Sequence, residues 1–403
     1  MSRFPAEFIQ AIPKTDLHLH LDGSLRIGTL IDLAREAGIA LPAQDEKGLR
    51  ERVFKDKYQN LEEYLQGFAL TTAVMQSEKA LFRVSYELMM DNAAEGVRYI
   101  EVRFAPQLLM SNSLSFHQVM GAVDNGLRQA CDELNATRNP DEPAYNYGII
   151  ACAMRFFTGD FSPWYRDFSR AHAFSTPTEI TRAASLELAK GVIRLRAETP
   201  VQIVGFDIAG AENGFPAIEH AESYALIQKG MLGKTVHAGE AFGPKSILQA
   251  VAKLRTDRIG HGLRLFDEDM IEPQKIADRT AYIESLVNYI ADRRIAIEVC
   301  LTSNMQTSPE IGELPKHALR KMLEHNLAVT LCTDNRLVSN TTVCREYALA
   351  LDNFEINAKC LRNIVLCGFK RSFYYRPYRE KRALVSSVGN YCDTLFQKFA
   401  IKD

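Results

Sequence analysis

The feature that most constrains this chain is the alternation of short apolar runs with longer segments of helical periodicity. Each run is rich in β-branched residues or too short for a stable helix, which is typical of buried strands. The segments between them carry apolar residues on one helical face, as at 82–94 and 181–196. The runs occupy 14–21, 97–104, 147–154, 201–208, 233–238, 258–261, 295–301 and 328–333.

This alternation predicts an α/β fold with a parallel sheet, because parallel strands are buried on both faces and read as near-continuous apolar runs. Eight such units predict closure into a (β/α)₈ barrel, the TIM barrel. A doubly wound open sheet is the alternative, but its usual glycine-rich phosphate loop is missing. Residues 42–80 predict an insertion after the first strand, with helical segments around 61–68. The tail after residue 370 predicts a helical C-terminal extension.

Composition limits the classes of protein that remain. The chain is 46% hydrophobic with a formal net charge of −2, which supports a large core and does not suggest nucleic acid as a partner. The N-terminus lacks a signal-peptide core, and no run of about 18 apolar residues predicts a membrane span. Eight cysteines without a Cys-x-x-Cys pair indicate free thiols in a reducing compartment. We therefore expect a cytoplasmic protein, with residues 1–403 forming a single domain; the oligomeric state is not readable.

Polar residues cluster where the predicted strands end, which is the catalytic face of such a barrel. They are Asp16, His18, His20 and Asp22 on the first run, Asp207 and Gly210 on the fourth, His237, Gly239 and Glu240 on the fifth, His261 on the sixth, Ser303 and Asn304 on the seventh, and Asp334 and Asn335 on the eighth.

Four of these residues predict a metal site. His18 and His20 are two apart on a strand and therefore point to the same face. With His237 and the carboxylate of Asp334 they form a ligand set that suits one Zn²⁺ ion per chain and leaves a position for water. Zinc would lower the pKa of that water to roughly 7 and so supply a nucleophile at neutral pH.

Two further residues complete the predicted chemistry. Glu240 lies three residues after a ligand and could donate a proton to the substrate; its position at a strand end favours this role over that of a solvated loop glutamate. His261 would act as an acid/base or as an electrostatic stabiliser. Remaining histidines, among them His220 and His317, lie in helical patterns and are interpreted as surface or partly satisfied side chains.

At this point the chain resembles the adenosine deaminase family of the amidohydrolase superfamily. The resemblance rests on TDLHLHLDGS (15–24), EGVRYIEVRFAP (95–106), VGFDIAGAE (204–212), TVHAGE (235–240), RIGHG (258–262) and TDN (333–335), in this order. It implies a hydrolytic deaminase of a purine nucleoside, expected to be adenosine, that releases ammonia and gives inosine.

The resemblance also implies roles for individual residues. Glu240 would protonate N1 of the purine, while His261 and Asp334 would orient and deprotonate the attacking water. Gly210 would contact the purine through its backbone N–H, and Asp22 would meet a ribose hydroxyl. A hydrophobic helix after the first strand would close over the substrate; its predicted face consists of Leu61, Tyr64, Leu65 and Phe68.

The sequence departs from the family pattern at two positions. Asn335 stands where many members have a second aspartate, and Phe156 follows Arg155 where many have histidine. We predict that the Asn335 amide donates to N7 of the purine, although asparagine after a strand is also a common turn residue.

Other substrates and other classes stay open. Within the deaminases they are adenine, an N6-modified adenine nucleotide, or a larger derivative such as aminodeoxyfutalosine. A nucleotide would need a cation for its phosphate, which Arg336 or the basic tail could supply. A binuclear hydrolase would need a bridging lysine on the fourth strand, and that strand ends in FDIAG. A non-catalytic binding protein on this fold would be indicated by broken ligands, and none is broken.

Overall fold

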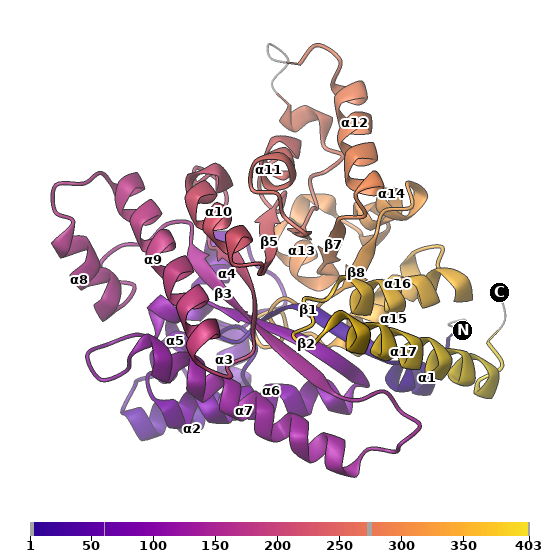
Figure 1. The fold of residues 1–403 in the computed structure, drawn as a ribbon, viewed down its shortest axis with the longest axis horizontal. Helices are drawn as coiled ribbons and strands as arrows, with labels where there is room; N and C mark the ends of the chain where they lie inside the picture. The colour runs from indigo at the N-terminus through magenta and orange to yellow at the C-terminus, as the bar shows by residue number, and fades with distance from the viewer. Residues whose placement is uncertain (1–3, 60, 272–275, 402–403) are drawn as a thin grey trace.

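The computed structural model describes residues 4–59, 61–271 and 276–401, and for residues 61 and 62 it describes only the backbone. Within these residues, eight parallel strands form one sheet in the order in which they occur along the chain (Figure 1). The strands are β1 (Lys14–His20), β2 (Val97–Phe104), β3 (Asn146–Met154), β4 (Ile203–Ala209), β5 (Gly233–Ala238), β6 (Arg258–His261), β7 (Ala296–Val299) and β8 (Val329–Leu331).

The sheet closes between its first and last strands. The backbone N–H of Asp334 donates to the carbonyl of His18 at 2.8 Å, and that of His20 donates to the carbonyl of Asp334 at 2.8 Å. Asp334 also forms a parallel bridge with Leu19. The predicted barrel is therefore confirmed and the open sheet is excluded, since an open sheet leaves its outer strands unpaired with each other.

Helices surround the barrel (Figure 1). They are α1 (Ala6–Ala11), α2 (Ile27–Ala37), α3 (Glu46–Arg52), α4 (Leu61–Leu65), α5 (Gly67–Val74), α6 (Glu78–Ala94), α7 (Phe116–Thr137), α8 (Pro163–Ala171), α9 (Pro177–Glu198), α10 (Ala221–Lys229), α11 (Pro244–Leu248), α12 (Arg279–Asp292), α13 (Leu301–Thr307), α14 (Leu319–Glu324), α15 (Val343–Asn353), α16 (Ala358–Arg371) and α17 (Tyr378–Lys398). Sequence signals fix several of their starts. Ser115 with Gln118, and Thr176 with Glu179, form reciprocal capping boxes at the N-termini of α7 and α9.

The predicted insertion after the first strand is present as α3, α4 and α5. The expected helical face over 61–68 is divided, because α4 ends at Leu65 and α5 begins at Gly67. Helix α2, which the sequence analysis did not identify, precedes the insertion and ends at Gly38 in the left-handed conformation that commonly terminates helices.

The predicted C-terminal extension consists of α16 and α17. Helix α17 packs beside α1, and the ring of Phe8 lies 5.3 Å from that of Phe396 (Figure 1). Between α16 and α17, the ring of Phe373 covers the guanidinium of Arg258, 3.7 Å from the ring centroid, at the start of β6. The extension therefore covers the end of the barrel where the strands begin. The polar cluster lies at the opposite end, where the strands finish.

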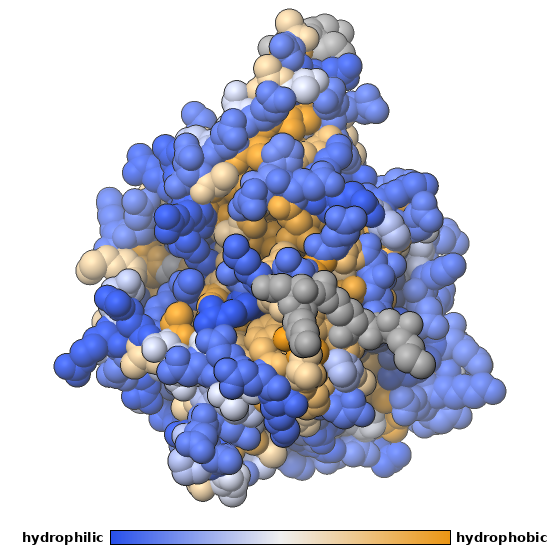
Figure 2. Space-filling view, turned by 90° about the vertical axis from the view of Figure 1, so that its right-hand side faces the viewer, coloured by the Kyte–Doolittle hydropathy of each residue, from blue (hydrophilic) through white to orange (hydrophobic). Residues whose placement is uncertain are grey.

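The surface and the cysteines agree with the composition. On the face that carries both termini, hydrophobic side chains lie mainly in recesses between hydrophilic ones (Figure 2). The eight cysteines are free thiols, as predicted. Among the described residues, no helix is long and apolar enough to cross a membrane.

Candidate active site

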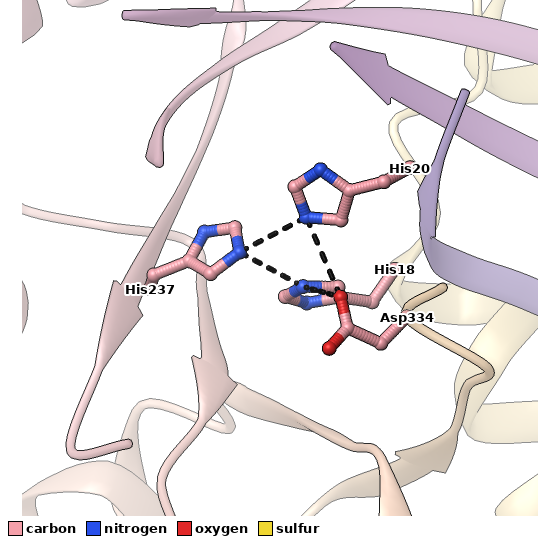
Figure 3. A group of neighbouring side chains, drawn as sticks. All are labelled: His18, His20, His237 and Asp334. Carbon is pink, nitrogen blue, oxygen red and sulfur yellow. Dashed lines mark hydrogen bonds and ion pairs between the residues drawn. The ribbon is translucent and has the colours of Figure 1, made fainter. Parts of the chain in front are cut away.

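Four predicted ligands meet at the mouth of the barrel (Figure 3). His18 and His20 come from β1 and His237 from β5, while Asp334 follows β8. One ligand atom from each of the four lies within 4.8 Å of the others, and all four residues are buried. The structure thus confirms the juxtaposition predicted from the two-residue spacing of His18 and His20.

Carboxylates behind two of the histidines fix which nitrogen faces inward. Nδ1 of His18 lies 2.8 Å from a carboxylate oxygen of Glu298, and Nδ1 of His237 lies 2.9 Å from one of Asp207. A carboxylate only accepts hydrogen bonds, so both Nδ1 atoms carry a proton and both Nε2 atoms present lone pairs. These Nε2 atoms face each other at 3.0 Å. Two lone pairs at that separation repel unless a cation lies between them, so the residues fit a bound metal ion.

Asp334 is held so that one oxygen faces the imidazoles. The Ser303 hydroxyl donates to Oδ2 at 2.6 Å, while Oδ1 lies 3.5 Å from Nε2 of both His18 and His20. Burial alone would raise the pKa of Asp334, but the neighbouring imidazoles of His18, His261 and His20 lower it overall. Asp334 also has φ of 62°, an unfavourable backbone conformation for this residue type that functional sites often contain.

Beneath the ligands lies a group of fully buried ion pairs, here called the ion-pair layer: Arg103, Arg258, Glu101, Glu298 and Asp207. Arg103 donates to Asp207 at 2.6 Å and to Glu298 at 2.9 Å, and Arg258 donates to Glu298 at 2.5 Å. Burial would raise the pKa of Glu298, but the two arginines hold it well below its usual value. The carboxylates that support the ligand histidines are therefore ionised.

Glu240 lies at the cavity side of the site, on the loop after β5. Its backbone is held by Glu212, whose carboxylate accepts from the N–H groups of Gly239, Glu240, Ala241 and Phe242 at 2.8–3.0 Å. The Glu240 side chain has no such partners. Burial, followed by the charges of Asp334 and Glu212, raises its pKa to about 8. Glu240 is therefore protonated at neutral pH and can act as a proton donor.

His261 stands between Glu240 and the ligands. Its Nε2 lies 3.8 Å from a carboxylate oxygen of Glu240, and its φ is 65°. Gly260 precedes it, and a Cβ at that position would lie 2.9 Å from Cε1 of His18, so only glycine fits against the ligand ring. Burial, followed by the charge of His18, lowers the pKa of His261 well below its usual value.

A cavity of about 940 Å³ opens over these residues. Asp22 and Gly210 line it, together with His20, His237, Glu240, His261, Asp334 and Asn335. Oδ1 of Asp22 is buried without a hydrogen-bond partner in the described structure, and burial raises the pKa of this carboxyl to about 7. Gly210 has φ of 97°, which a residue with a side chain rarely adopts.

One wall of the cavity comes from α4 and α5, the helices that contain the predicted helical face. Tyr64, Leu65 and Phe68 line it, whereas the side chain of Leu61 lies outside the described residues. The Tyr64 hydroxyl lies 2.7 Å from that of Ser339 and accepts from the Asn335 amide at 2.8 Å. One N–H of Asn335 is therefore already engaged, which the sequence did not indicate.

The opposite wall contains Phe156, the second departure from the family pattern. Its ring stacks on Phe215, with centroids 4.8 Å apart, and meets Phe161 edge to face. Arg155 turns away and donates to the backbone carbonyls of Phe215 and His237. Position 156 therefore presents an aromatic ring to the cavity.

Two histidines interpreted as surface or partly satisfied side chains are in fact buried. His220 is 2% exposed and Nδ1 lies 2.9 Å from the Ser185 hydroxyl, while His317 is 1% exposed with both ring nitrogens hydrogen-bonded. The prediction failed because short polar segments on the helical side of a barrel can lie under a neighbouring helix, and periodicity over a few residues does not detect this.

The motifs in the sequence assign no role to the residues that hold the site in place, chiefly Glu298, Glu212 and Arg103. A signal was available for Glu298 and Arg103, because each is a charged residue inside an otherwise apolar strand, and an unpaired charge is very costly there. Glu212 gave no such signal, since its partners are backbone N–H groups of another loop.

Comparisons with known proteins agree with this geometry. The profile of the family described as "Adenosine deaminase" matches residues 13–162 and 171–391. An adenosine deaminase of Mycobacteroides abscessus is 36% identical over 94% of this chain and 95% of its own length. Adenosine deaminase 1 of Streptomyces coelicolor is 34% identical over 94% and 87%, respectively.

Solved structures support the same fold. An adenine deaminase from Arthrobacter aurescens superposes with a TM-score of 0.73 at 21% identity, covering 95% of this chain and all of the other. An N6-mAMP deaminase of Arabidopsis gives 0.71 at 25% identity, covering 95% of this chain and 99% of the other.

Proposed function

The chain belongs to the adenosine deaminase family of hydrolases acting on C–N bonds, and we propose that its substrate is adenosine, with 2′-deoxyadenosine as a second substrate. Water replaces the 6-amino group, so the products are inosine and ammonia. This reaction requires a nucleophile made from water and a group that protonates the purine ring.

The observation that carries the proposal is the position of Glu240 in the cavity. This carboxyl is buried, its pKa is raised to about 8, and it lies beside His261 above the ligand cluster. A neutral carboxylic acid next to a metal-ligand group is what protonation of N1 requires during attack at C6.

The residues around it take the remaining roles. Asp334 accepts a proton from the attacking water, and His261 orients that water. The backbone N–H of Gly210 contacts the purine, and the unpartnered Oδ1 of Asp22 accepts from a ribose hydroxyl. Tyr64, Leu65 and Phe68 exclude water over the base.

The metal in this proposal is one zinc ion per chain. His18, His20, His237 and Asp334 would hold it, and when bound it would supply the water-derived nucleophile at neutral pH. Three imidazoles and one carboxylate form a donor set that zinc accepts readily, and the described residues contain no second group of this type.

The charges around the cavity favour a nucleoside over a nucleotide. Among the described lining residues, Arg166 is the one permanent cation, and it lies 3.5 Å from Asp167. Arg336 pairs with Glu95 instead of lining the cavity. The basic tail contributes Arg376 and Lys381 to a separate cavity beside β4 and β5. Neither Arg336 nor the basic tail therefore reaches the active-site cavity, where a cation would be needed to bind the phosphate of a nucleotide.

A substrate panel tests the proposal. Adenosine, 2′-deoxyadenosine, adenine, AMP, N6-methyl-AMP and aminodeoxyfutalosine are followed at the purine absorbance band, and ammonia release is measured in parallel. The expected result is the highest kcat/KM for the two nucleosides. A higher value for either nucleotide would overturn the choice of substrate while leaving the deaminase assignment intact.

A further inference from the structure

A chain of hydrogen bonds leads from the back of His261 to a residue outside the cavity. His317 precedes α14, and Asn304 lies on α13 between His317 and His261. Nδ1 of His317 accepts the backbone N–H of Leu319 at 3.0 Å, and its Nε2 lies 3.2 Å from Oδ1 of Asn304. Nδ2 of Asn304 lies 3.0 Å from Nδ1 of His261. Both intermediate side chains are at most 1% exposed.

The donor and acceptor roles along this chain of hydrogen bonds are set at its far end, at His317. A backbone N–H can only donate, so Nδ1 of His317 is an acceptor and the proton of the neutral ring is on Nε2. Burial lowers the pKa of His317 to about 3, which keeps the ring neutral. Its Nε2–H therefore donates to Oδ1 of Asn304, and this fixes which way the Asn304 amide points.

The amide then determines the state of His261. Because Oδ1 of Asn304 is used by His317, its NH₂ group faces Nδ1 of His261. That nitrogen must accept, so in the neutral ring the proton is on Nε2. Nε2 is the nitrogen on the side of Glu240 and the cavity. His261 therefore presents a hydrogen-bond donor to the reacting groups.

We propose that His317, acting through Asn304, is a positioning residue that fixes the proton of His261 on Nε2. His261 is then the donor that orients the attacking water and stabilises developing negative charge on its oxygen. It has no free lone pair on the cavity side, so deprotonation of the water falls to Asp334 alone. The effect of this tautomer on kcat rests on the proposed function, whereas the tautomer itself does not depend on that function.

The first test reads the tautomer directly. Zinc-loaded protein labelled with ¹⁵N at histidine gives ring-nitrogen signals that distinguish Nδ1–H from Nε2–H, and His261→Gln assigns the signal. In the wild type we expect His261 as the Nε2–H form. Replacing His317 by phenylalanine removes the donor to Asn304, so the amide can rotate and the Nδ1–H form of His261 should appear. A pure Nε2–H signal in His317→Phe would overturn the proposal.

The second test is kinetic. His317→Phe should lower kcat about 10- to 100-fold, as loss of a supporting hydrogen bond typically does, while KM changes little because His317 does not line the cavity. His317→Gln can still accept from Leu319 and donate to Asn304, so it should restore both the tautomer and most of kcat. If His317→Gln were as slow as His317→Phe while keeping the Nε2–H form, the effect would be packing and the proposal would fail.

Two further variants keep the result interpretable. Asn304→Asp places an acceptor-only group against Nδ1 of His261 and should force a proton onto that nitrogen. This variant tests the tautomer independently of the folding of His317→Phe. His220→Phe is the matched control, because it removes another buried histidine whose pKa burial lowers to about 3. It should leave the His261 signal unchanged and kcat within about twofold. A shifted His261 signal in His220→Phe would show general sensitivity to packing and would count against the relay. The spectra need no substrate, so they stand even if adenosine is not deaminated.

Discussion

Two groups of buried charged side chains in this barrel differ in how they are neutralised. In the ion-pair layer, each charge has an opposite partner at hydrogen-bond distance, and the pKa of Glu298 is held well below its usual value. In the cavity above, no lysine or arginine among the described residues pairs with Glu240 or Asp22, and burial raises their pKa values to about 8 and about 7, respectively. The same depth of burial therefore gives permanent ions in one group and carboxyls that titrate near neutral pH in the other.

This difference distinguishes carboxylates that support the ligand histidines from carboxylates that can take part in proton transfer. Paired carboxylates orient ligand histidines and keep their charge at every pH in which the protein works, while unpaired ones can gain and release protons near neutrality. His18 connects the groups, because Nδ1 contacts Glu298 below and Nε2 faces the other ligands above. Variants in each group should consequently fail in different ways.

The largest effect is expected for His18→Ala, which removes the metal ligand that Glu298 of the ion-pair layer supports. We predict that zinc content falls from about one to near zero per chain and that activity disappears with it, because ligand loss and metal loss are linked. Elemental analysis and turnover are measured on the same preparation. Two metal ions per wild-type chain, or activity without metal, would contradict the mononuclear site.

Glu240→Gln should keep the metal but lose most turnover. Glutamine can accept or donate a hydrogen bond, but it has no acidic proton to give to N1, and general acid catalysis is worth on the order of 10²–10⁴-fold. Zinc content is the control, since Glu240 is outside the ligand group. Near-normal turnover would mean that another residue is the proton donor.

Arg258→Met tests the ion-pair layer. It leaves the carboxylates of Glu101 and Glu298 buried with one partner fewer, and breaking a buried pair in this way costs about 3–5 kcal/mol of the free energy of unfolding. The matched control is Arg26→Met, whose partner Asp91 is partly exposed, and we expect under about 1 kcal/mol there. Equal losses in denaturant titrations would show that the layer contributes no more than a surface pair.

The pH dependence of kcat/KM should report the protonation of Glu240, which belongs to the unpaired group. Glu240 must be protonated to act, so kcat/KM should fall as pH rises through about 8, by about tenfold per unit above that value. The fall should be absent in Glu240→Gln. Asp22→Asn should retain it, because the pKa of Asp22 is about 7 and belongs to a different group. A fall that persists in Glu240→Gln would assign the titration elsewhere.

The two groups also differ in how far the sequence reveals them. Strand ends and the two-residue spacing of His18 and His20 predict the mouth of the barrel, because side chains alternate along a strand. Pairs across the barrel, such as Arg258 with Glu101, depend on the register of a closed sheet, which local patterns do not determine. The chain from His317 to His261 crosses three separate segments and was missed for the same reason.

The smallest effect concerns Asn335, which belongs to the cavity and carries a donor at every pH. Its amide donates to Tyr64 with one N–H and carries a second N–H, which we propose donates to N7 of the purine. Asn335→Ala should lower kcat/KM for adenosine by an amount corresponding to about 1–3 kcal/mol. It should leave 7-deazaadenosine nearly unchanged, because that analogue lacks the acceptor.

Tyr64→Phe separates reading of N7 from support of the wall. It removes the hydroxyl that accepts from Asn335 and contacts Ser339, but it keeps the amide and the aromatic ring. If Asn335 recognises N7, Tyr64→Phe should cost less than Asn335→Ala with adenosine and should still discriminate against 7-deazaadenosine. If both variants slow both substrates equally, Asn335 only holds the loop after β8 against α4. The cavity would then recognise the purine through Glu240 and Gly210 without a contact at N7.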